Sequence, residues 1–468
     1  MIRVTVYCAA NIGERAFWRK RPLPQRTSRR IMTGRTDIGR VYPILSSLLF
    51  LLLTGCQLPP TLPSATIDNQ ARVVESAVVV ETVSLGPRPF YLLDQLREGP
   101  LRTQLEACRA GPFLATQFSI GHRGAPLQFP EHTRVSYRAA ARMGAGTLEC
   151  DVTFTRDQKL VCRHSQCDLA TTTNILETPL AKRCATPFKP ARINPSTGEL
   201  ETAASARCCT SEFTWAELQT LAAKMDSFDP RATTPEMFIR GTTPWRTDLY
   251  SSDDQILSHD QSIALFRSLG TAMTPELKAP SVAMPFEGTY TQTDYARAIV
   301  DDYRLAGIPP SDVFLQSFDI DVHREWITYA PEFSPYAILG VEPSAEVTTQ
   351  NYLDSIRQEG IRTVAAPTSM LLNLDNSGRI VATQFAKDLR AAGIEIVAWT
   401  LERSGRIQDG RIEGNASDFY LGSMLPSLEN DGDVYRIIDA LNLQVGVIAI
   451  FSDWPATVTY YANCVGLN

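Results

Sequence analysis

The sequence predicts an α/β protein, a (β/α)8 TIM barrel that carries a β-hairpin and a cysteine-rich insertion after its second strand. Eight short apolar runs are typical of buried strands, and helical patterns lie between several of them. A further apolar run follows the second strand too closely for a crossover helix, because parallel strands need a dozen or more residues between them. That run must therefore return as a hairpin.

The predicted strands follow one another along the chain from residue 117 to residue 453. They are QFSIGH (117–122), TLECDV (147–152), AMTPELK (272–278), VFLQSF (313–318), YAILGV (336–341), RTVAAP (362–367), EIVAWT (395–400) and GVIAIFSD (446–453). Helical patterns include residues 132–144, 293–307 and 382–393, and the last two end in glycine, a common helix stop. This alternation within one unit favours a closed parallel barrel.

The hairpin lies in TFTRDQKLVCRH (153–164). A turn centred on Asp157 and Gln158 sets Asp151 roughly opposite His164, so the returning strand brings a histidine level with a carboxylate. Residues 165–250 follow as a long irregular insertion that holds four cysteines. We expect this insertion to be a lobe fastened by disulfides within the barrel domain, which spans residues 113–468.

The N-terminus has the features of an export signal. Residues 1–55 carry ten Lys and Arg against two acids, and an apolar run too short to span a bilayer ends at Cys56. The LTGC sequence at its end resembles the bacterial lipobox, which implies lipidation of Cys56. The alternatives are a plain signal peptide or a partly buried helix with a chance cysteine. We therefore expect an exported protein, anchored at the outer membrane or the periplasmic face, with residues 56–112 as a Pro-rich tether and pre-barrel segment.

Composition and cysteine usage narrow the class of protein. The chain has 468 residues, 44% hydrophobic and 21% charged, with a net charge of -6, as in ordinary soluble globular proteins. Since residues 1–55 contribute +8, the remainder carries about -14, which argues against a nucleic-acid partner. Eight cysteines follow Cys56, and in an oxidising compartment they favour disulfides over zinc, because no CxxC pair occurs. Cys108 and Cys464 flank the barrel and are an attractive pair.

Charged side chains gather where predicted strands end. In a barrel of this kind the active site lies at the carboxyl ends of the strands. Side chains along a strand alternate between its two faces, so Glu149 and Asp151 lie on one face of the second strand. The same alternation places Glu276 and Lys278 on one face of the third strand. The set that converges is His122, Arg123, Glu149, Asp151, His164, Glu276 and Lys278. Carboxylates beside cationic groups form a hard-oxygen metal site suited to a phosphoryl oxygen.

Each of these elements alone has an ordinary explanation. Two carboxylates at this spacing usually belong to a solvated strand face, and a His-Arg-Gly sequence is usually a strand end with common hydrogen bonds. The joint placement at successive strand ends is what indicates a catalytic site.

Six motifs resemble those of the glycerophosphodiester phosphodiesterase family, in its order and spacing, from residue 119 to residue 455. They are GHRGA (121–125), PEHT (130–133), LECDVTFTRDQKLVCRH (148–164), PELK (275–278), QSFD (316–319) and IFSDWP (450–455), where Asp453 and Pro455 match the family's closing element. The PEHT form is similar to that of the family's periplasmic, glycerol-metabolism branch, which implies a role in lipid metabolism.

The resemblance implies a hydrolase that uses calcium, or alternatively magnesium, to cut glycerophosphodiesters to glycerol 3-phosphate and an alcohol. It implies Glu149, Asp151 and Glu276 as metal ligands, and His122 and His164 as general acid and base. Arg123 would hold phosphate oxygens and Lys278 would add positive charge. The chain departs from the family pattern at Ser165, where an aspartate usually follows the histidine.

Other side chains have candidate roles near the predicted mouth of the barrel, which is the end where the carboxyl ends of the strands meet. Gln316, Phe318 and Trp399 end two strands and are candidates for substrate binding, with Trp399 as a wall for the glycerol moiety, although aromatic residues there often serve core packing. We expect His132 to cap the first helix, and His259 and His323 to be surface residues.

The predicted function is metal-dependent hydrolysis of small glycerophosphodiesters such as glycerophosphocholine. One alternative is a phospholipase-like phosphodiesterase that acts on lysophospholipid or sphingomyelin. Another is a surface-binding lipoprotein that has lost turnover, although the intact histidines and carboxylates count against it.

Overall fold

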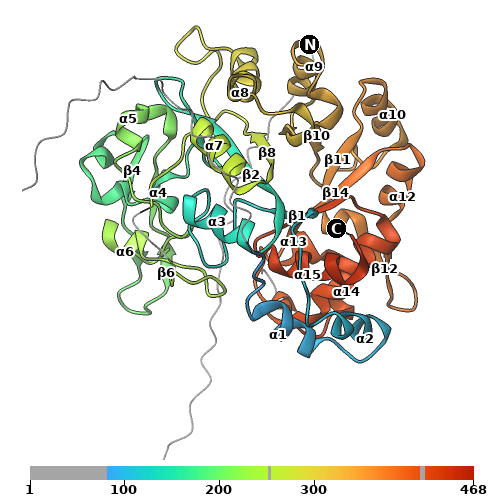
Figure 1. Cartoon of the computed structure of the whole chain (residues 1–468). Helices are drawn as coiled ribbons and strands as arrows, with labels where there is room; N and C mark the ends of the chain where they lie inside the picture. The colour runs from blue at the N-terminus through green and yellow to red at the C-terminus, as the bar shows by residue number, and fades with distance from the viewer. Residues whose placement is uncertain (1–81, 251–253, 412–416, 468) are drawn as a thin grey trace, which may run out of the picture. The chain divides into compact units, whose positions relative to one another are not determined.

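Eight parallel strands close into a barrel in the computed structural model, which describes residues 82–250, 254–411 and 417–467 (Figure 1). The strand order β1-β15-β14-β11-β10-β9-β8-β2 closes through a β1–β2 pairing, which confirms the predicted (β/α)8 barrel. The strands are β1 (Thr116–Gly121), β2 (Ala145–Phe154), β8 (Ala272–Leu277), β9 (Gln316–Ser317), β10 (Ile338–Gly340), β11 (Thr363–Pro367), β14 (Glu395–Leu401) and β15 (Ala449–Ser452).

Helices connect the strands, and local sequence signals set their ends. The longest begins at a capping box between Thr291 and Asp294 and ends at Gly307, whose positive φ allows the left-handed C-cap. The helices of the barrel domain include α3 (Arg134–Arg142), α7 (His259–Leu269), α8 (Gln292–Ala306), α9 (Ile320–Tyr329), α10 (Gln350–Gln358), α12 (Gln384–Ala391), α14 (Val434–Ala440) and α15 (Ala456–Val465).

Apolar side chains fill the interior of the barrel, so it is a packed core below a polar mouth. This interior cluster is Ile120, Ile338, Ala365, Val397, Ala449 and Phe451. The pre-barrel segment adds α1 (Arg88–Gln95) and α2 (Pro100–Ala107), which pack against α15. The expected disulfide between Cys108 and Cys464 is present and joins α2 to the end of α15.

The predicted hairpin is present, but its register differs from the prediction by one residue. β2 pairs antiparallel with β3 (Leu160–Cys162), and the Arg163 amide donates to the Asp151 carbonyl at 2.7 Å. Arg163, and not His164, therefore lies opposite Asp151. The cause is a three-residue turn of residues 156–158, closed by the Thr155 amide donating to Lys159 at 3.0 Å, with Gln158 at a positive φ.

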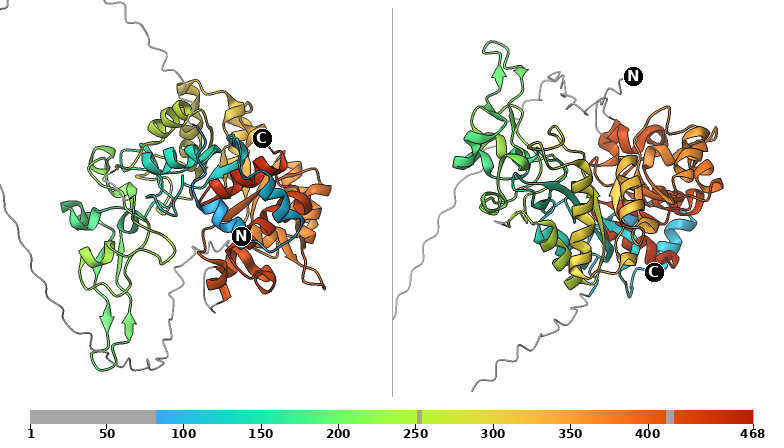
Figure 2. Two further views of the ribbon diagram at one scale, coloured as in Figure 1. Left: turned by 60° about the horizontal axis from the view of Figure 1, so that its bottom comes forward. Right: turned by 90° about the horizontal axis from the view of Figure 1, so that it is seen from above.

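The insertion after β3 forms a lobe with an apolar cluster of its own, drawn in green in Figure 2. Two disulfides, Cys167–Cys209 and Cys184–Cys208, lie within it, and a third, Cys150–Cys162, links β2 to β3. We call residues 165–250 the lobe. Its elements include α4 (Leu169–Thr172), β4 (Thr186–Lys189), β5 (Arg192–Ile193), β6 (Leu200–Thr202), β7 (Ser205–Arg207), α5 (Trp215–Leu218) and α6 (Pro235–Ile239).

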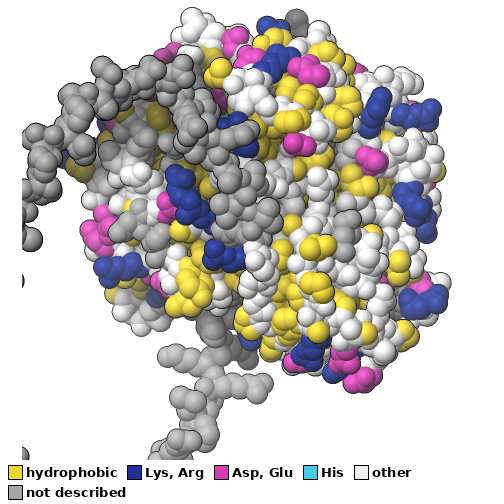
Figure 3. All heavy atoms as spheres, viewed as in Figure 1, with side chains coloured by type: hydrophobic (Ala, Val, Ile, Leu, Met, Phe, Trp, Pro, Cys, Tyr) yellow, Lys and Arg dark blue, Asp and Glu magenta, His cyan; other side chains and the backbone are white. Residues whose placement is uncertain are grey.

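Within the described residues, no helix combines the length and the apolar character needed to cross a bilayer. On the face drawn in Figure 3, Lys and Arg side chains lie at separated positions, interleaved with Asp and Glu. Cys56, the predicted lipidation site, lies outside the described residues.

Candidate active site at the barrel mouth

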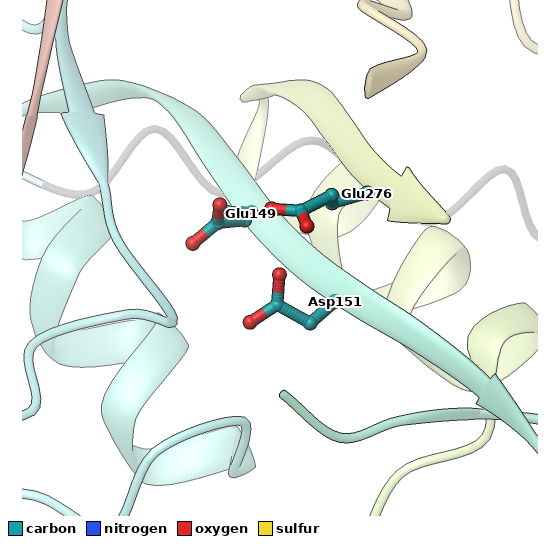
Figure 4. A group of neighbouring side chains, drawn as sticks. All are labelled: Glu149, Asp151 and Glu276. Carbon is teal, nitrogen blue, oxygen red and sulfur yellow. The ribbon is translucent and has the colours of Figure 1, made fainter. Parts of the chain in front are cut away.

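Three carboxylates from two neighbouring strands point toward one another (Figure 4). Glu149 and Asp151 lie on the same face of β2, and Asp151 pairs in register with Glu276 of β8. One oxygen from each residue lies within 4.8 Å of the others, and all three side chains are buried. The structure thus brings together the three residues that the sequence predicts as metal ligands.

The carboxylates repel one another, which their pKa values express. Burial, and then the charges of Asp151 and Glu276, raise the pKa of Glu149 well above its usual range. Burial raises the pKa of Glu276 to about 7, although Lys278 opposes the change. The pKa of Asp151 is instead held well below its usual range, because Lys278 and His132 outweigh the effect of burial.

The donor set fits a hard divalent cation. Asp151 Oδ1 is buried and accepts no hydrogen bond from the residues that the structure describes, and Lys278 Nζ lies 4.0 Å from it, beyond hydrogen-bond distance. A buried polar atom without a partner is costly, and a cation would satisfy it. Three carboxylate oxygens are ligands that calcium and magnesium prefer. The group could therefore hold a metal ion.

Two side chains hold Glu276 in place. The Lys278 ammonium donates to its Oε1, and the Gln316 amide donates to its Oε2 at 2.9 Å. Lys278 Nζ also lies 4.0 Å from Asp151 Oδ1. Gln316, predicted to bind substrate, therefore contacts a carboxylate of the candidate metal site directly.

His122 lies between the carboxylates and the last strand of the barrel. Its Nδ1 is 2.6 Å from Asp453 Oδ1, and its Nε2 is 3.9 Å from Glu149 Oε2. Burial and the charge of Arg123 lower the pKa of His122 to about 4, so the ring is neutral near pH 7. Since the carboxylate of Asp453 accepts a hydrogen bond from Nδ1–H, the proton of the neutral ring stays on Nδ1, and Nε2 can take up another proton.

Arg123 lies beside the carboxylates in a strained backbone conformation, with a φ of 56°. Its amide donates to Glu149 Oε2 at 2.9 Å, and its guanidinium contacts Glu131 at 3.2 Å and Asp151 at 3.3 Å. Arg123 and Arg403 hold the pKa of Glu131 well below its usual range, although burial opposes them. Arg123 thus fixes the position of a candidate metal ligand.

His132 has a different role from the predicted one. Thr133 caps α3, since its hydroxyl accepts from the Ser136 amide at 3.2 Å. His132 Nε2 instead lies 2.9 Å from Asp151 Oδ2, and its Nδ1 lies 2.8 Å from the Tyr137 hydroxyl. The cap prediction for His132 is therefore wrong, and the residue orients a candidate metal ligand.

The surface prediction is wrong for the two remaining structural histidines. His259 is buried and contacts Asp302 at 2.8 Å, and His323 is buried with its Nε2 3.0 Å from the Ser317 carbonyl. Both side chains face the core side of their helices.

His164 lies within the field of the same charged groups. Burial, followed by the positive charges of Arg123 and Lys278, holds the pKa of His164 well below its usual range. It is therefore a second neutral imidazole at the mouth near pH 7.

Two arginines that the sequence analysis did not identify meet Asp453 on the side away from His122. Arg246 of the lobe and Arg403, which follows β14, each lie 3.3 Å from Asp453 Oδ2. Asp453 was quoted as a motif match, but no local pattern marks either arginine, because the fold alone brings these distant positions together.

Aromatic side chains line one side of the mouth. Phe318 and Trp399 pack edge to face with centroids 5.8 Å apart, and Phe419 and Tyr420 contact Trp399 at 5.8 Å and 6.1 Å. Lys278 Nζ lies 5.9 Å from the Phe318 ring centroid. Phe318 is 39% exposed, so this wall is open to a ligand. Phe419 and Tyr420 were not predicted.

The sequence model of the glycerophosphoryl diester phosphodiesterase family matches residues 122–457, which include every residue described at the mouth. The chain belongs to this family. The match confirms the resemblance seen in the motifs, and it places the chain among phosphoric diester hydrolases.

Individual relatives match the chain over different lengths. A protein of Arthroderma benhamiae named Extracellular protein is 43% identical over 248 residues, 52% of this chain and all of the relative. A glycerophosphodiester phosphodiesterase of Arabidopsis thaliana is 22% identical over 393 residues, 80% of this chain and 91% of the relative. A phosphodiesterase of Oleispira antarctica, solved with the product sn-glycerol 3-phosphate, is 18% identical with a TM-score of 0.43, and the match covers 73% of this chain and 95% of that one.

Proposed function

We propose that the protein hydrolyses glycerophosphodiesters, such as glycerophosphocholine, to glycerol 3-phosphate and an alcohol, with the help of a divalent cation. The observation that carries this proposal is the buried trio of Glu149, Asp151 and Glu276, which lies beside a neutral histidine and a buried arginine. The family match over residues 122–457 supports the same substrate class.

In this proposal the trio holds the cation, calcium or alternatively magnesium. A bound divalent cation stabilises negative charge on phosphoryl oxygens. Lys278 and Gln316 keep Glu276 oriented, and His132 does the same for Asp151. Arg123 supplies positive charge for phosphate oxygens, because its guanidinium is buried beside Glu131 and Asp151 at the same mouth.

His122 and His164 act as the proton-transfer pair. His122 accepts a proton at Nε2, because Asp453 occupies its Nδ1 side. The imidazolium that forms is stabilised by the negative charge of Asp453. His164 serves the opposite half of the exchange: it donates a proton to the leaving oxygen from its imidazolium form, which the negative charge of a bound phosphodiester favours.

Phe318 and Trp399 form the wall for the glycerol moiety, and Phe419 extends it. We also propose the division into a signal (1–55), a tether and pre-barrel segment (56–112) and a barrel domain (113–468) with its inserted lobe. Export, with a lipid anchor at Cys56 on the outer membrane or periplasmic face, completes the proposal. The similarity to a fungal protein named Extracellular protein supports export.

The test is release of glycerol 3-phosphate from glycerophosphocholine by the purified chain. We expect turnover with calcium, and loss of at least about 100-fold with a chelator or with His122→Ala, because general acid–base catalysis contributes that much or more. Glu429→Gln, an exposed substitution, is the control. Absence of turnover on any glycerophosphodiester by the folded, calcium-loaded protein would contradict the proposal. Lysophospholipid and sphingomyelin would then be tried.

A further inference from the structure

One buried arginine of the lobe, Arg246, reaches the mouth of the barrel. The Arg246 side chain is 5% exposed, and its Nη2 lies 3.3 Å from Asp453 Oδ2. Its Nη1 donates to the Asp226 carbonyl, also in the lobe, at 3.3 Å. Asp453 Oδ1 in turn contacts His122 Nδ1 at 2.6 Å. One carboxylate therefore links the lobe to the histidine.

The segment around Arg246 is docked on two loops of the barrel. The amide of Thr247 donates to the Leu127 carbonyl at 3.1 Å, in the loop after β1. Trp245 packs over Gly405, in the loop after β14, so closely that a Cβ at Gly405 would lie 2.9 Å from the indole ring. Both neighbours of Arg246 thus fix its place against the mouth.

An arginine at this position is unfavourable for stability alone. Burial, and then the like charge of Arg403, lower the pKa of Arg246. Its Nε is buried and has no acceptor among the described residues. Two guanidinium groups share one oxygen of Asp453, at 3.3 Å each. A buried pair of like charges costs stability, so such an arrangement points to a functional demand.

The demand is orientation of a carboxylate. Asp453 accepts a hydrogen bond from His122 Nδ1–H only while its Oδ1 lies in the plane of the ring. Rotation about the side-chain bonds of Asp453 would break that hydrogen bond. Contacts to Oδ2 prevent this rotation. Arg246 and Arg403 share this task, since each lies 3.3 Å from Oδ2, and the other terminal nitrogen of Arg403 lies 3.7 Å from Glu131 and 4.0 Å from Asp226.

We infer that Arg246 is a positioning residue for His122, acting through Asp453, and that the lobe is therefore part of the catalytic centre. This inference rests on the proposed function. It predicts that Arg246→Met lowers kcat about 10- to 100-fold, as loss of orienting contacts does, with KM within about twofold.

A double-mutant cycle tests the inference in the full chain, with glycerophosphocholine as substrate at saturating calcium. Arg246→Met, Asp453→Asn and the double variant are compared with wild type. If Arg246 acts through Asp453, Arg246→Met reduces kcat less than about threefold in the Asp453→Asn background. Arg192→Met, a 74% exposed lobe substitution, is the matched control and leaves kcat unchanged.

Two results would overturn the inference while wild type still turns over. Multiplied effects in the double variant would mean that Arg246 acts independently of Asp453. A raised KM with unchanged kcat would mean that Arg246 binds substrate. If Arg246→Met fails to fold, Arg246→Lys enters the same cycle, because it keeps the charge but loses the planar fork. A wild-type protein without turnover would instead contradict the proposed function, and the inference with it.

Discussion

Replacing Glu149 by glutamine should stabilise the metal-free protein and abolish its response to a cation. Glu149 lies within 4.8 Å of two other carboxylates, so each neighbour repels it by at least about 3 kcal/mol at an effective dielectric constant of about 20. Arg123 and Lys278 offset part of this repulsion. We therefore expect Glu149→Gln to raise the free energy of unfolding in a chelator by about 1–3 kcal/mol at pH 7.

The pH dependence has a definite sign. The folded-state pKa of Glu149 lies above its ordinary value, so between the two values the folded protein holds a proton that the unfolded chain has released. The free energy of unfolding of the metal-free wild type therefore falls as pH rises above about 4.5, and the fall is smaller in Glu149→Gln. Calcium at about 100 times its dissociation constant should restore about 2.7 kcal/mol in wild type.

The assay is denaturant unfolding at pH 5 and pH 7, with chelator and with calcium, for wild type, Glu149→Gln and the exposed control Glu429→Gln. The reasoning fails if calcium stabilises Glu149→Gln as much as wild type. It also fails if the chelated variant is less stable than chelated wild type, since repulsion in the trio would then not govern stability.

Three further variants test the aromatic wall and the lobe. Gly340→Ala places a Cβ 2.7 Å from the Phe318 ring and should raise KM several-fold with little change in kcat; an unchanged KM would exclude Phe318 from substrate binding. Replacing Cys184 and Cys208 by serine should lower the free energy of unfolding by about 3 kcal/mol, from loop closure over 24 residues, as denaturant unfolding under oxidising conditions would show. Lys224→Met removes three ammonium–carbonyl hydrogen bonds within the lobe and should cost about 2–4 kcal/mol by the same measurement, whereas a loss below about 1 kcal/mol would contradict that role.

The barrel and its carboxylate trio could be predicted because both depend on short-range periodicity. Because side chains in β2 alternate between two faces, Glu149 and Asp151, which are two positions apart, lie on the same face. The neighbouring parallel strand β8 places Glu276 beside Asp151. All eight predicted strands are present. The hairpin register was harder, since a two-residue and a three-residue turn both suit its sequence, and only the backbone at Gln158 distinguishes them.

The histidines show where sequence periodicity fails. His259 begins a helix in a polar stretch, yet its ring hydrogen-bonds to the carboxylate of Asp302 in α8. The Tyr303 ring packs edge to face on the imidazole, with the centroids 5.1 Å apart. His132 follows a proline and a glutamate, which favours a helix start, and the cap falls one residue later. In both cases a partner distant in sequence decides the environment, so composition around the histidine carries no signal.

The groups around the two ring nitrogens of His122 come from different kinds of structure. This difference explains why the carboxylates could be predicted and Arg246 and Arg403 could not. On the Nε2 side, the carboxylates come from neighbouring strands whose ends recur at regular spacing. On the Nδ1 side, Asp453 is held by residues 246 and 403, which belong to an insertion and to a loop. Arg246 lies in an irregular insertion, so the strand periodicity that predicts the carboxylates gives no signal for it. Removing the lobe from this chain should therefore lower kcat for glycerophosphocholine even though the carboxylate trio stays intact, and an unchanged kcat would contradict the role of Arg246.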